Sequence, residues 1–330
     1  MSIEADAAAR PCRILSLDGG GAKGFYTIGV LKEVEALLGG LPLCDRFDLI
    51  FGTSTGAIIA ALLALGHRVD DIHKLYRDHV PKIMKRWLPR ERTKELNRLA
   101  NEVFGETKFT DVKTRVGIVA THWLMQRPMI FKGDKFQAHG MQASFVPGFG
   151  CTIADAVKAS CSAYPYFKRA IIKTRENAEH GQGIEQEVEV FDGGYCANNP
   201  TLYAIADAVK PLGKRHEDLR ILSIGVGVYP SPKKWISPMV IASWLATTVF
   251  AGFKGTELLQ KTLDVNTTSM EQLRKILFGD IKAVRIDERF EQPEMATDLL
   301  ESDLKKLSLL YQRGRQSYAA EENAIKALLI

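Results

Sequence analysis

The sequence predicts an α/β fold with a largely parallel central sheet, helices on both faces and extra helices over one edge. Two strand–turn–helix units support this fold. In residues 47–66, FDLIFGTSTGAIIAALLALG, an apolar strand runs into a glycine-rich turn and then into an alanine- and leucine-rich helix. In residues 13–38, the strand RILSL is followed by the loop DGGGAKG and an amphipathic helix. Strands that alternate with helices in this way are typical of parallel sheets.

The rest of the chain continues this alternation at first and then becomes mostly helical. Residues 67–110 are polar with a helical pattern, a helix is predicted over 152–160, and another starts after NNP at 198–200. We expect a core over residues 12–230 with a helical insertion at about 67–110, and a mostly helical part over 231–330 packed on the same domain. Further segments predict strands at 116–121, 129–132, 187–191, 220–226 and 283–286.

Composition and charge are those of an ordinary globular protein. Of the 330 residues, 46% are hydrophobic and 25% are charged, and the net charge is +5. A surplus this small does not indicate a DNA or RNA partner, although it is compatible with an anionic ligand or surface. The N-terminal sequence MSIEADAAAR has two acids and no apolar run, so we do not expect a signal peptide. The cysteines lack a C-x-x-C pair and are expected to be reduced: Cys12, Cys44, Cys151, Cys161 and Cys196.

The turn GTSTG at residues 52–56 predicts a nucleophile. G-x-S-x-G between a strand and a helix is the pattern of a nucleophile elbow, in which a tight turn exposes one hydroxyl group. Gly52 and Gly56 leave room for the close backbone approach that such a turn requires. Ser54 would also sit at a helix N-terminus, where the helix dipole favours developing negative charge. The alternative is a glycine-rich turn whose serine only caps the helix.

The loop DGGGAKG at residues 18–24 predicts an anion-binding site. The backbone N–H groups of Gly19, Gly20 and Gly21 can point at one negatively charged atom, as in the oxyanion hole of an acyl-transfer enzyme. Lys23 would add positive charge or hold the loop in place.

The same loop satisfies the dinucleotide fingerprint G-x-G-x-x-G, which gives a second hypothesis: a nucleotide-binding module without hydrolytic activity. That module needs an acidic residue at the C-terminal end of the next strand. Asp45 and Asp48 instead precede or open the strand, and its C-terminal end carries the GTSTG turn. The acyl-transfer interpretation therefore fits the sequence better.

A third glycine-bearing turn, DGG at residues 192–194, follows the strand predicted at 187–191. In an open parallel sheet, ligands bind outside the C-terminal ends of the strands, so we expect all three turns to converge at one edge. Ser54 and Asp192 would then form a catalytic dyad, supported by Gly193, with Asp192 as the general base. A carboxylate suits this role if partial burial raises its pKa.

A histidine would be needed only for a Ser–His–Asp triad, and His216 is the candidate. The order Ser54, Asp192, His216 is that of α/β-hydrolases. However, His216 lies just before a predicted strand, which places it at the opposite edge of the sheet from Ser54. The polar helical segments also contain histidines that we expect on the surface, namely His67, His73 and His79. The sequence therefore favours the dyad over a Ser–His–Asp esterase.

Two further segments have two interpretations each. Six cationic residues surround Trp87 between residues 82 and 94. They form either a solvated helix face or a functional surface, namely a lid or a contact with anionic lipid headgroups. Residues 236–253 carry no charge, which is at the lower limit of length for a membrane span. We expect a core helix or a membrane-surface helix there, and Trp235 and Trp244 keep the second alternative open.

The three motifs resemble the patatin-like phospholipase family, whose pattern is D-G-G-G-x-[RK]-G, then G-x-S-x-G, then D-G-[GA]. This chain matches at residues 18–24, 52–56 and 192–194, and residues 160–167 resemble the family's serine-alanine-proline loop. The resemblance spans roughly residues 12–230.

This resemblance implies the three-layer patatin-like fold, with the extra helices covering the active-site edge. It implies Ser54 as nucleophile, Asp192 as base and Gly19 to Gly21 as oxyanion hole, with Lys23, Gly52, Gly56 and Gly193 in support. The implied activity is that of a phospholipase A, which hydrolyses acyl esters of membrane glycerophospholipids in peripheral contact with the membrane. No metal or other cofactor is implied.

Longer stretches, residues 13–35, 191–209 and 293–315, resemble bacterial members of the family that are activated by 3′,3′-cyclic GMP-AMP. This implies a cyclic dinucleotide activator and a cytoplasmic anti-phage effector that degrades the host inner membrane from its inner face. It is compatible with assembly into a homo-oligomer on activation. No phosphate-binding motif beyond the glycine loop marks the nucleotide site, and the basic segment 82–94 and the C-terminal third are its candidate locations. A constitutive patatin-like hydrolase without nucleotide control is the alternative.

Overall fold

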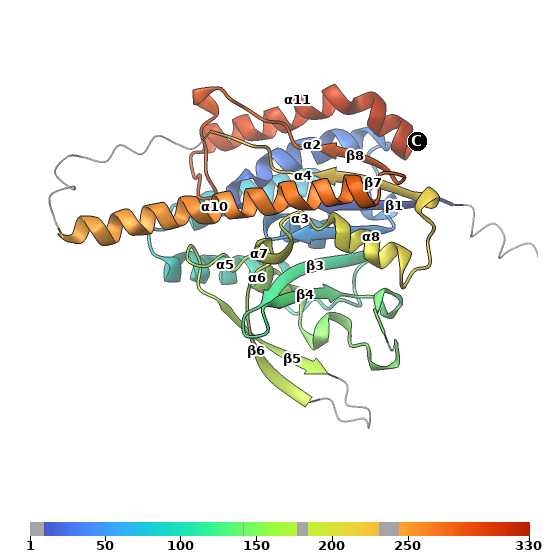
Figure 1. Cartoon of the computed structure of the whole chain (residues 1–330), viewed down its shortest axis with the longest axis horizontal. Helices are drawn as coiled ribbons and strands as arrows, with labels where there is room; N and C mark the ends of the chain where they lie inside the picture. Colours follow the sequence, from blue (N-terminus) through green and yellow to red (C-terminus); the bar gives the residue numbers. More distant parts are fainter. Residues whose placement is uncertain (1–9, 141, 177–183, 231–243) are drawn as a thin grey trace, which may run out of the picture.

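A computed structural model of the chain describes residues 10–140, 142–176, 184–230 and 244–330 (Figure 1). Within these residues, eight strands form one sheet in the order β5-β6-β3-β2-β1-β7-β8, and β4 pairs with β3 outside this path. The strands are β1 Cys12–Leu17, β2 Leu49–Thr53, β3 Arg115–His122, β4 Arg127–Lys132, β5 Ala170–Glu176, β6 Ile184–Asp192, β7 Leu219–Ile224 and β8 Lys282–Ile286.

The sheet is parallel in its centre and antiparallel at one side. β1 runs parallel to β2 and β7, β2 runs parallel to β3, and β7 runs parallel to β8. The pairs β3–β4, β3–β6 and β5–β6 are antiparallel. The predicted α/β fold with a central sheet is confirmed. β5 was not among the strands that the sequence predicted.

Helices cover both faces, because the strand residues alternate between two apolar cores. Leu15 and Leu17 face the larger core, whereas Ile14 and Phe51 face the smaller one. The larger core packs against α2, α3, α4, α5, α6 and α11, and the smaller core packs against α7 and α8. The helices are α2 Gly24–Leu37, α3 Thr55–Ala64, α4 Val69–Met84, α5 Pro89–Phe104, α6 Ile153–Ser160, α7 Gly194–Ala197, α8 Thr201–Val209, α10 Trp244–Leu277 and α11 Leu304–Leu329.

The C-terminal helix α11 packs closely along α2, and the two lie side by side in Figure 1. The closest approach occurs at glycines. A Cβ atom at Gly29 would lie 2.0 Å from the carbonyl oxygen of Tyr311, and one at Gly314 would lie 2.0 Å from that of Tyr26. The absence of side chains at these two positions therefore sets the helix spacing. The division of the chain into a core and a C-terminal part stays a prediction.

The uncharged segment 236–253 lies partly outside the described residues, because residues 236–243 are not described and residues 244–253 are described only as helical backbone. Its predicted surroundings are therefore untested. Among the described residues, no helix is long and apolar enough to span a membrane. The five cysteines form no disulfide bond.

Candidate active site

The glycine loop, Ser54 and Asp192 meet at one edge of the sheet, as the sequence predicted. The loop follows the C-terminal end of β1, and Ser54 follows that of β2. These two strands are parallel neighbours, so their ends lie side by side. Asp192 is the last residue of β6.

Asp192 reaches this edge by a route that the sequence did not predict. β6 runs antiparallel to β3 and pairs only with the end of that strand, where Asp192 lies opposite Ala120. β2 pairs with the preceding residues of β3, and Thr53 lies opposite Val119. β4 pairs with one side of β3. β2 and β6 therefore both pair with the other side of β3, one after the other along its length. The expectation that all three turns follow parallel strands is therefore wrong for β6, although the predicted convergence is present.

Ser54 occupies a strained turn between β2 and α3. Its φ of 53° and ψ of −119° are rare for a residue other than glycine. A Cβ atom at Gly52 would lie 2.2 Å from the carbonyl oxygen of Gly56, and one at Gly56 would lie 2.3 Å from that of Leu17. Both positions therefore require glycine. Backbone packing on both sides holds the turn in this conformation, as in a nucleophile elbow.

The Ser54 hydroxyl group donates a hydrogen bond to the carboxylate of Asp192, with an Oγ–Oδ2 distance of 2.6 Å. The other carboxylate oxygen accepts the backbone N–H of Gly194 at 2.7 Å. Asp192 is only 3% exposed. Burial raises the pKa of Asp192 to about 6, and the two hydrogen bonds limit the increase. A carboxylate with this pKa is mostly ionised at neutral pH and accepts a proton more readily than an exposed aspartate.

Gly193 lets this carboxylate approach β3, because a Cβ atom there would lie 2.2 Å from the carbonyl oxygen of Val119. Ser160, at the end of α6, was not predicted to contribute. Its hydroxyl group accepts the backbone N–H of Ser54 at 2.9 Å and donates to the carbonyl oxygen of Val119 at 2.5 Å. Ser160 therefore connects the elbow to β3. The only sequence signal was its place at the start of residues 160–167.

In the glycine loop, one of the three predicted oxyanion donors is already occupied. The N–H of Gly19 donates to the carbonyl oxygen of Asn198 at 3.0 Å. The N–H groups of Gly20 and Gly21 donate to no acceptor within the described residues, and both glycines line the cavity that contains Ser54. The geometry therefore corrects the candidate oxyanion hole to Gly20 and Gly21, and gives Gly19 a structural role.

Two charged residues of the loop are buried away from Ser54. Asp18 forms a two-pronged ion pair with Arg285 on β8, at 2.9 Å and 2.5 Å. The Lys23 side chain is buried, and its Nζ lies 6.0 Å from the centre of the Tyr229 ring. Lys23 does not line the cavity. Of its two predicted roles, holding the loop fits this position.

The cavity at Ser54 is narrow and mostly apolar. Its volume is about 60 Å³, which is room for a few water molecules. The polar end is formed by the glycine loop, Ser54 and Asp192. The apolar wall comes from the facing sides of α4 and α5, the 161–167 segment and residues 299–300. This arrangement presents a hydroxyl nucleophile, a buried base and free N–H donors to an apolar ligand.

The alternative residues lie elsewhere. The imidazole of His216 contacts Asp280 at 2.8 Å, just before the N-terminal end of β7, at the opposite edge of the sheet. Asp45 and Asp48 precede β2 and also lie at that opposite edge, so they cannot complete a dinucleotide site at the glycine loop. His73 is half-buried and not fully exposed on the surface, because its ring stacks on that of Tyr311 with 4.0 Å between the ring centres.

None of the described histidines lines the Ser54 cavity. Among the described residues, no group of three or more His, Cys, Asp and Glu side chains is arranged to hold a metal ion.

Comparison with known proteins connects this geometry to a family. A protein from Escherichia coli described as a cUMP-AMP-activated phospholipase is 56% identical over 319 residues, which cover 97% of this chain and 94% of that protein. An E. coli (strain TW11681) protein described as a cGAMP-activated phospholipase is 29% identical over 64% of this chain and 61% of that protein. Patatin-like protein 3 of Arabidopsis thaliana is 31% identical over 72% of this chain and 64% of that protein.

The crystal structure of VipD from Legionella pneumophila aligns with a TM-score of 0.47 and 13% identity, over 97% of this chain and 67% of that one.

Residues 15–205, more than half of the chain, match the family described as patatin-like phospholipase. The chain therefore belongs to the patatin-like phospholipase family and is an enzyme of the phospholipase class.

Proposed function

We propose that this chain is a phospholipase A that hydrolyses acyl esters of membrane glycerophospholipids through a Ser54–Asp192 dyad. The observation that carries the proposal is the 2.6 Å hydrogen bond from the Ser54 hydroxyl group to a buried carboxylate. No histidine is required, since Asp192 contacts the nucleophile directly and its pKa is raised to about 6. The apolar wall of the cavity suits a fatty acyl chain.

In the first step, Asp192 takes the proton of Ser54 while Oγ attacks the carbonyl carbon of the ester. The carbonyl oxygen becomes negatively charged and is held by the N–H groups of Gly20 and Gly21. The tetrahedral intermediate then breaks the ester bond, the leaving alkoxide of the lysophospholipid takes the proton from Asp192, and the acyl group remains on Ser54.

In the second step, Asp192 takes a proton from water, which attacks the acyl carbon. The same N–H groups hold the second oxyanion. When this intermediate collapses, the Ser54 oxygen regains a proton from Asp192 and the fatty acid leaves. One carboxylate thus serves both half-reactions, so its ionised form is required in each.

We further propose that a cyclic dinucleotide activates the enzyme. A cavity of about 60 Å³ does not admit an acyl chain of many methylene groups, so catalysis requires this edge of the molecule to open. The 56% identical relative is described as activated by cUMP-AMP, and the one activated by cGAMP is only 29% identical. We therefore propose cyclic UMP-AMP as the activator, in place of the cyclic GMP-AMP that the sequence suggested.

The test is release of fatty acid from phosphatidylethanolamine–phosphatidylglycerol vesicles. Three samples of the full chain contain no nucleotide, cyclic UMP-AMP or 3′,3′-cyclic GMP-AMP, and Ser54→Ala serves as the matched control in each. We expect release that needs both cyclic UMP-AMP and Ser54. Equal release in all three samples would support the constitutive hydrolase instead. Release by Ser54→Ala would contradict the dyad.

The proposal extends to a cellular role as an anti-phage effector, in which the activated enzyme acts from the cytoplasm on the inner membrane. Co-expression with an enzyme that makes the activating dinucleotide should then permeabilise cells that contain the parent chain. Cells that contain Ser54→Ala should keep an intact membrane. Equal permeabilisation in both would remove this role while leaving the hydrolase unaffected.

A further inference from the structure

The connection between α4 and α5 exposes apolar side chains to solvent beside the active-site cavity. Trp87 is 81% exposed and Leu88 is 52% exposed. Large apolar side chains that stand next to each other in solvent are typical of surfaces that bind a partner or a membrane. The connection directly follows Ile83 and Met84, which line the cavity at Ser54, so it lies near the edge of the sheet where β2 ends.

Cationic side chains surround these two residues. Arg86 pairs with Glu95, and Arg92 donates to the carbonyl oxygen of Tyr166. The remaining cations are exposed and form no ion pair within the described part of the chain: Lys82, Lys85, Arg90 and Lys94. Glu91 is the only acid between residues 82 and 94. The segment therefore combines two exposed apolar side chains with four exposed cations that have no ion-pair partner among the described residues.

The same two helices form the apolar wall of the cavity. Ile83 and Met84 at the end of α4, and Leu96 and Leu99 on α5, line the space that contains Ser54. The inner sides of α4 and α5 thus face the substrate cavity, while the segment that joins them projects into solvent. A lipid that leaves a bilayer at Trp87 would reach Ser54 along these helices.

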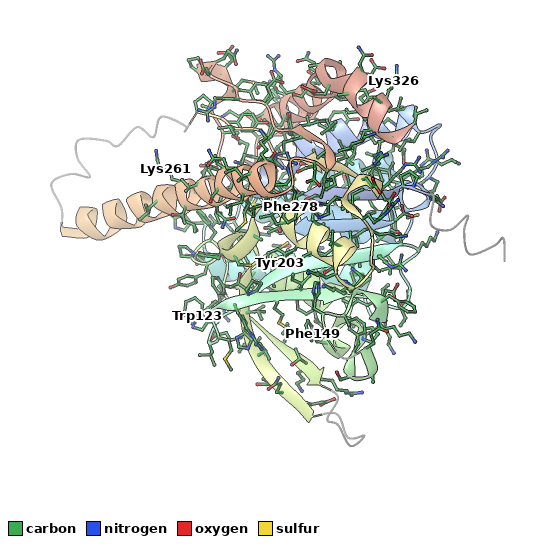
Figure 2. All side chains as sticks on the ribbon, turned by 45° about the vertical axis from the view of Figure 1, so that its right-hand side comes forward. Trp123, Phe149, Tyr203, Lys261, Phe278 and Lys326 are labelled. Atoms are coloured by element: carbon green, nitrogen blue, oxygen red, sulfur yellow. The ribbon has the colours of Figure 1, made fainter. Side chains whose placement is uncertain are left out.

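A second apolar turn stands at the same edge. The β3–β4 turn exposes Leu124 by 75% and Met125 by 64%. The guanidinium group of Arg169 lies 4.2 Å from the centre of the Trp123 ring beside them. Because β3 runs parallel to β2, this turn projects beyond the same strand ends as Ser54. Figure 2 shows Trp123 at the margin of the molecule.

We propose that the α4–α5 connection, residues 82–94, and the β3–β4 turn together form a docking surface for an anionic phospholipid bilayer. Tryptophan and leucine enter the interfacial layer, and the cations contact lipid phosphates. The inference deepens the proposed function, on which it rests, because it states how the substrate is presented to Ser54. A bilayer is favoured over a protein partner because the surface adjoins a cavity that is lined for an acyl chain.

The experiment measures binding and needs no catalysis. The full chain with Ser54→Ala is sedimented with vesicles of phosphatidylglycerol or of phosphatidylcholine. The test variant adds Lys85→Glu, Trp87→Ala and Arg90→Glu. The matched control adds Lys210→Glu, Ile276→Ala and Lys282→Glu, which also replaces two cations and one exposed apolar residue but lies toward the opposite edge of the sheet.

We expect the lipid concentration for half-maximal binding to phosphatidylglycerol to rise at least about tenfold in the test variant and less than about twofold in the control. Phosphatidylcholine vesicles and added salt should weaken binding of the parent. Equal weakening in both variants, no weakening in either, or equal binding to both lipids would overturn the proposal. Unchanged thermal melting of the test variant is the check on folding.

A second measurement locates the contact. Vesicles whose acyl chains carry bromine quench the fluorescence of tryptophan that enters the bilayer. Trp87→Phe should keep its vesicle binding but lose at least part of this quenching, whereas full quenching in Trp87→Phe would contradict insertion at this site. Fatty-acid release is a separate readout. Absence of release with intact vesicle binding would count against the proposed function, and release without the predicted binding loss would count against this inference alone.

Discussion

Two buried aspartates in this chain begin the same tripeptide, Asp-Gly-Gly, at the same edge of the sheet: Asp18 directly follows β1, and Asp192 is the last residue of β6. Asp18 faces the guanidinium group of Arg285 and forms two short hydrogen bonds with it. Asp192 faces a hydroxyl group and a backbone N–H. The pKa of Asp192 is raised to about 6 by burial with no cation against it. Burial raises the pKa of Asp18 as well, to about 7, although the guanidinium group opposes this increase.

Asp18 and Asp192 have similar local sequences, burial and positions in the sheet. They differ in the groups that contact their carboxylates. Both oxygens of the Asp18 carboxylate accept hydrogen bonds from Arg285, and Asp18 does not line the cavity that contains Ser54. The Asp192 carboxylate instead accepts a hydrogen bond from the Ser54 hydroxyl group and lines that cavity, so it can take the proton of the nucleophile. The first therefore suits an anchor for the glycine loop, and the second suits a general base.

The largest expected effect separates the two residues by activity. Asp192→Asn should lower kcat/KM by about 10²–10⁴-fold, because no other described group in the cavity accepts the Ser54 proton. Asp18→Asn, the matched control, should keep at least a tenth of the parent activity but lose about 1.5–3 kcal/mol of stability, since one charged hydrogen-bond partner is removed. Fatty-acid release and thermal melting distinguish the two. Equal losses of activity in the two variants would contradict the assignment of Asp192, and not Asp18, as the general base.

The next effect concerns the anchor alone. Arg285→Met should cost about 3–5 kcal/mol of stability, because it leaves the buried carboxylate of Asp18 without its cation. Burial already raises the pKa of Asp18 to about 7, and loss of the guanidinium group raises it further above its unfolded value. The carboxyl group therefore favours the folded state when protonated and loses that contribution as pH rises. Urea unfolding should therefore show a larger loss at pH 8 than at pH 5. A loss independent of pH would indicate that Asp18 is not the affected group.

A smaller effect sharpens the role of Asp192. Because the base must be ionised, kcat/KM for a soluble short-chain ester should fall about tenfold per pH unit below a midpoint near 6, and should level off above about pH 7. The soluble ester avoids changes in membrane charge with pH. A midpoint near 4 would show that burial does not raise the pKa of the base, and a plateau that begins only above pH 8 would point to another group.

The central strands could be predicted from the sequence because they are short apolar runs, and β1, β2 and β7 also lead into glycine-bearing turns. β1, β2, β3 and β7 have ends close to the predicted ones. The direction of β6 could not be predicted, since alternation of apolar residues indicates a strand but not its neighbour or its orientation. β5, with the sequence AIIKTRE, was missed because it is a polar edge strand whose only partner is β6.

The candidate site was predictable where its parts are local motifs. Ser54 and Asp192 lie in glycine turns that the sequence marks, and the structure brings them into contact. The partners of these motifs were not predictable. Arg285 meets Asp18 across 267 residues, and Ser160 meets the N–H of Ser54 across 106. Such contacts depend on how the helices and strands pack, and a single sequence contains no local pattern for them.

The smallest expected effect tests whether catalysis needs His216 in addition to Ser54 and Asp192. His216→Ala should change kcat/KM by less than about twofold, because this imidazole contacts Asp280 at the opposite edge of the sheet and only one exposed contact is lost. Asp280→Ala, which breaks the same pair, is the matched control and should behave alike in activity and melting temperature. A loss of activity in His216→Ala alone would mean that the histidine reaches the site in the working enzyme. In that case Asp192 would orient an imidazole, and its direct hydrogen bond to Ser54 would no longer explain why this aspartate, and not Asp18, is the base.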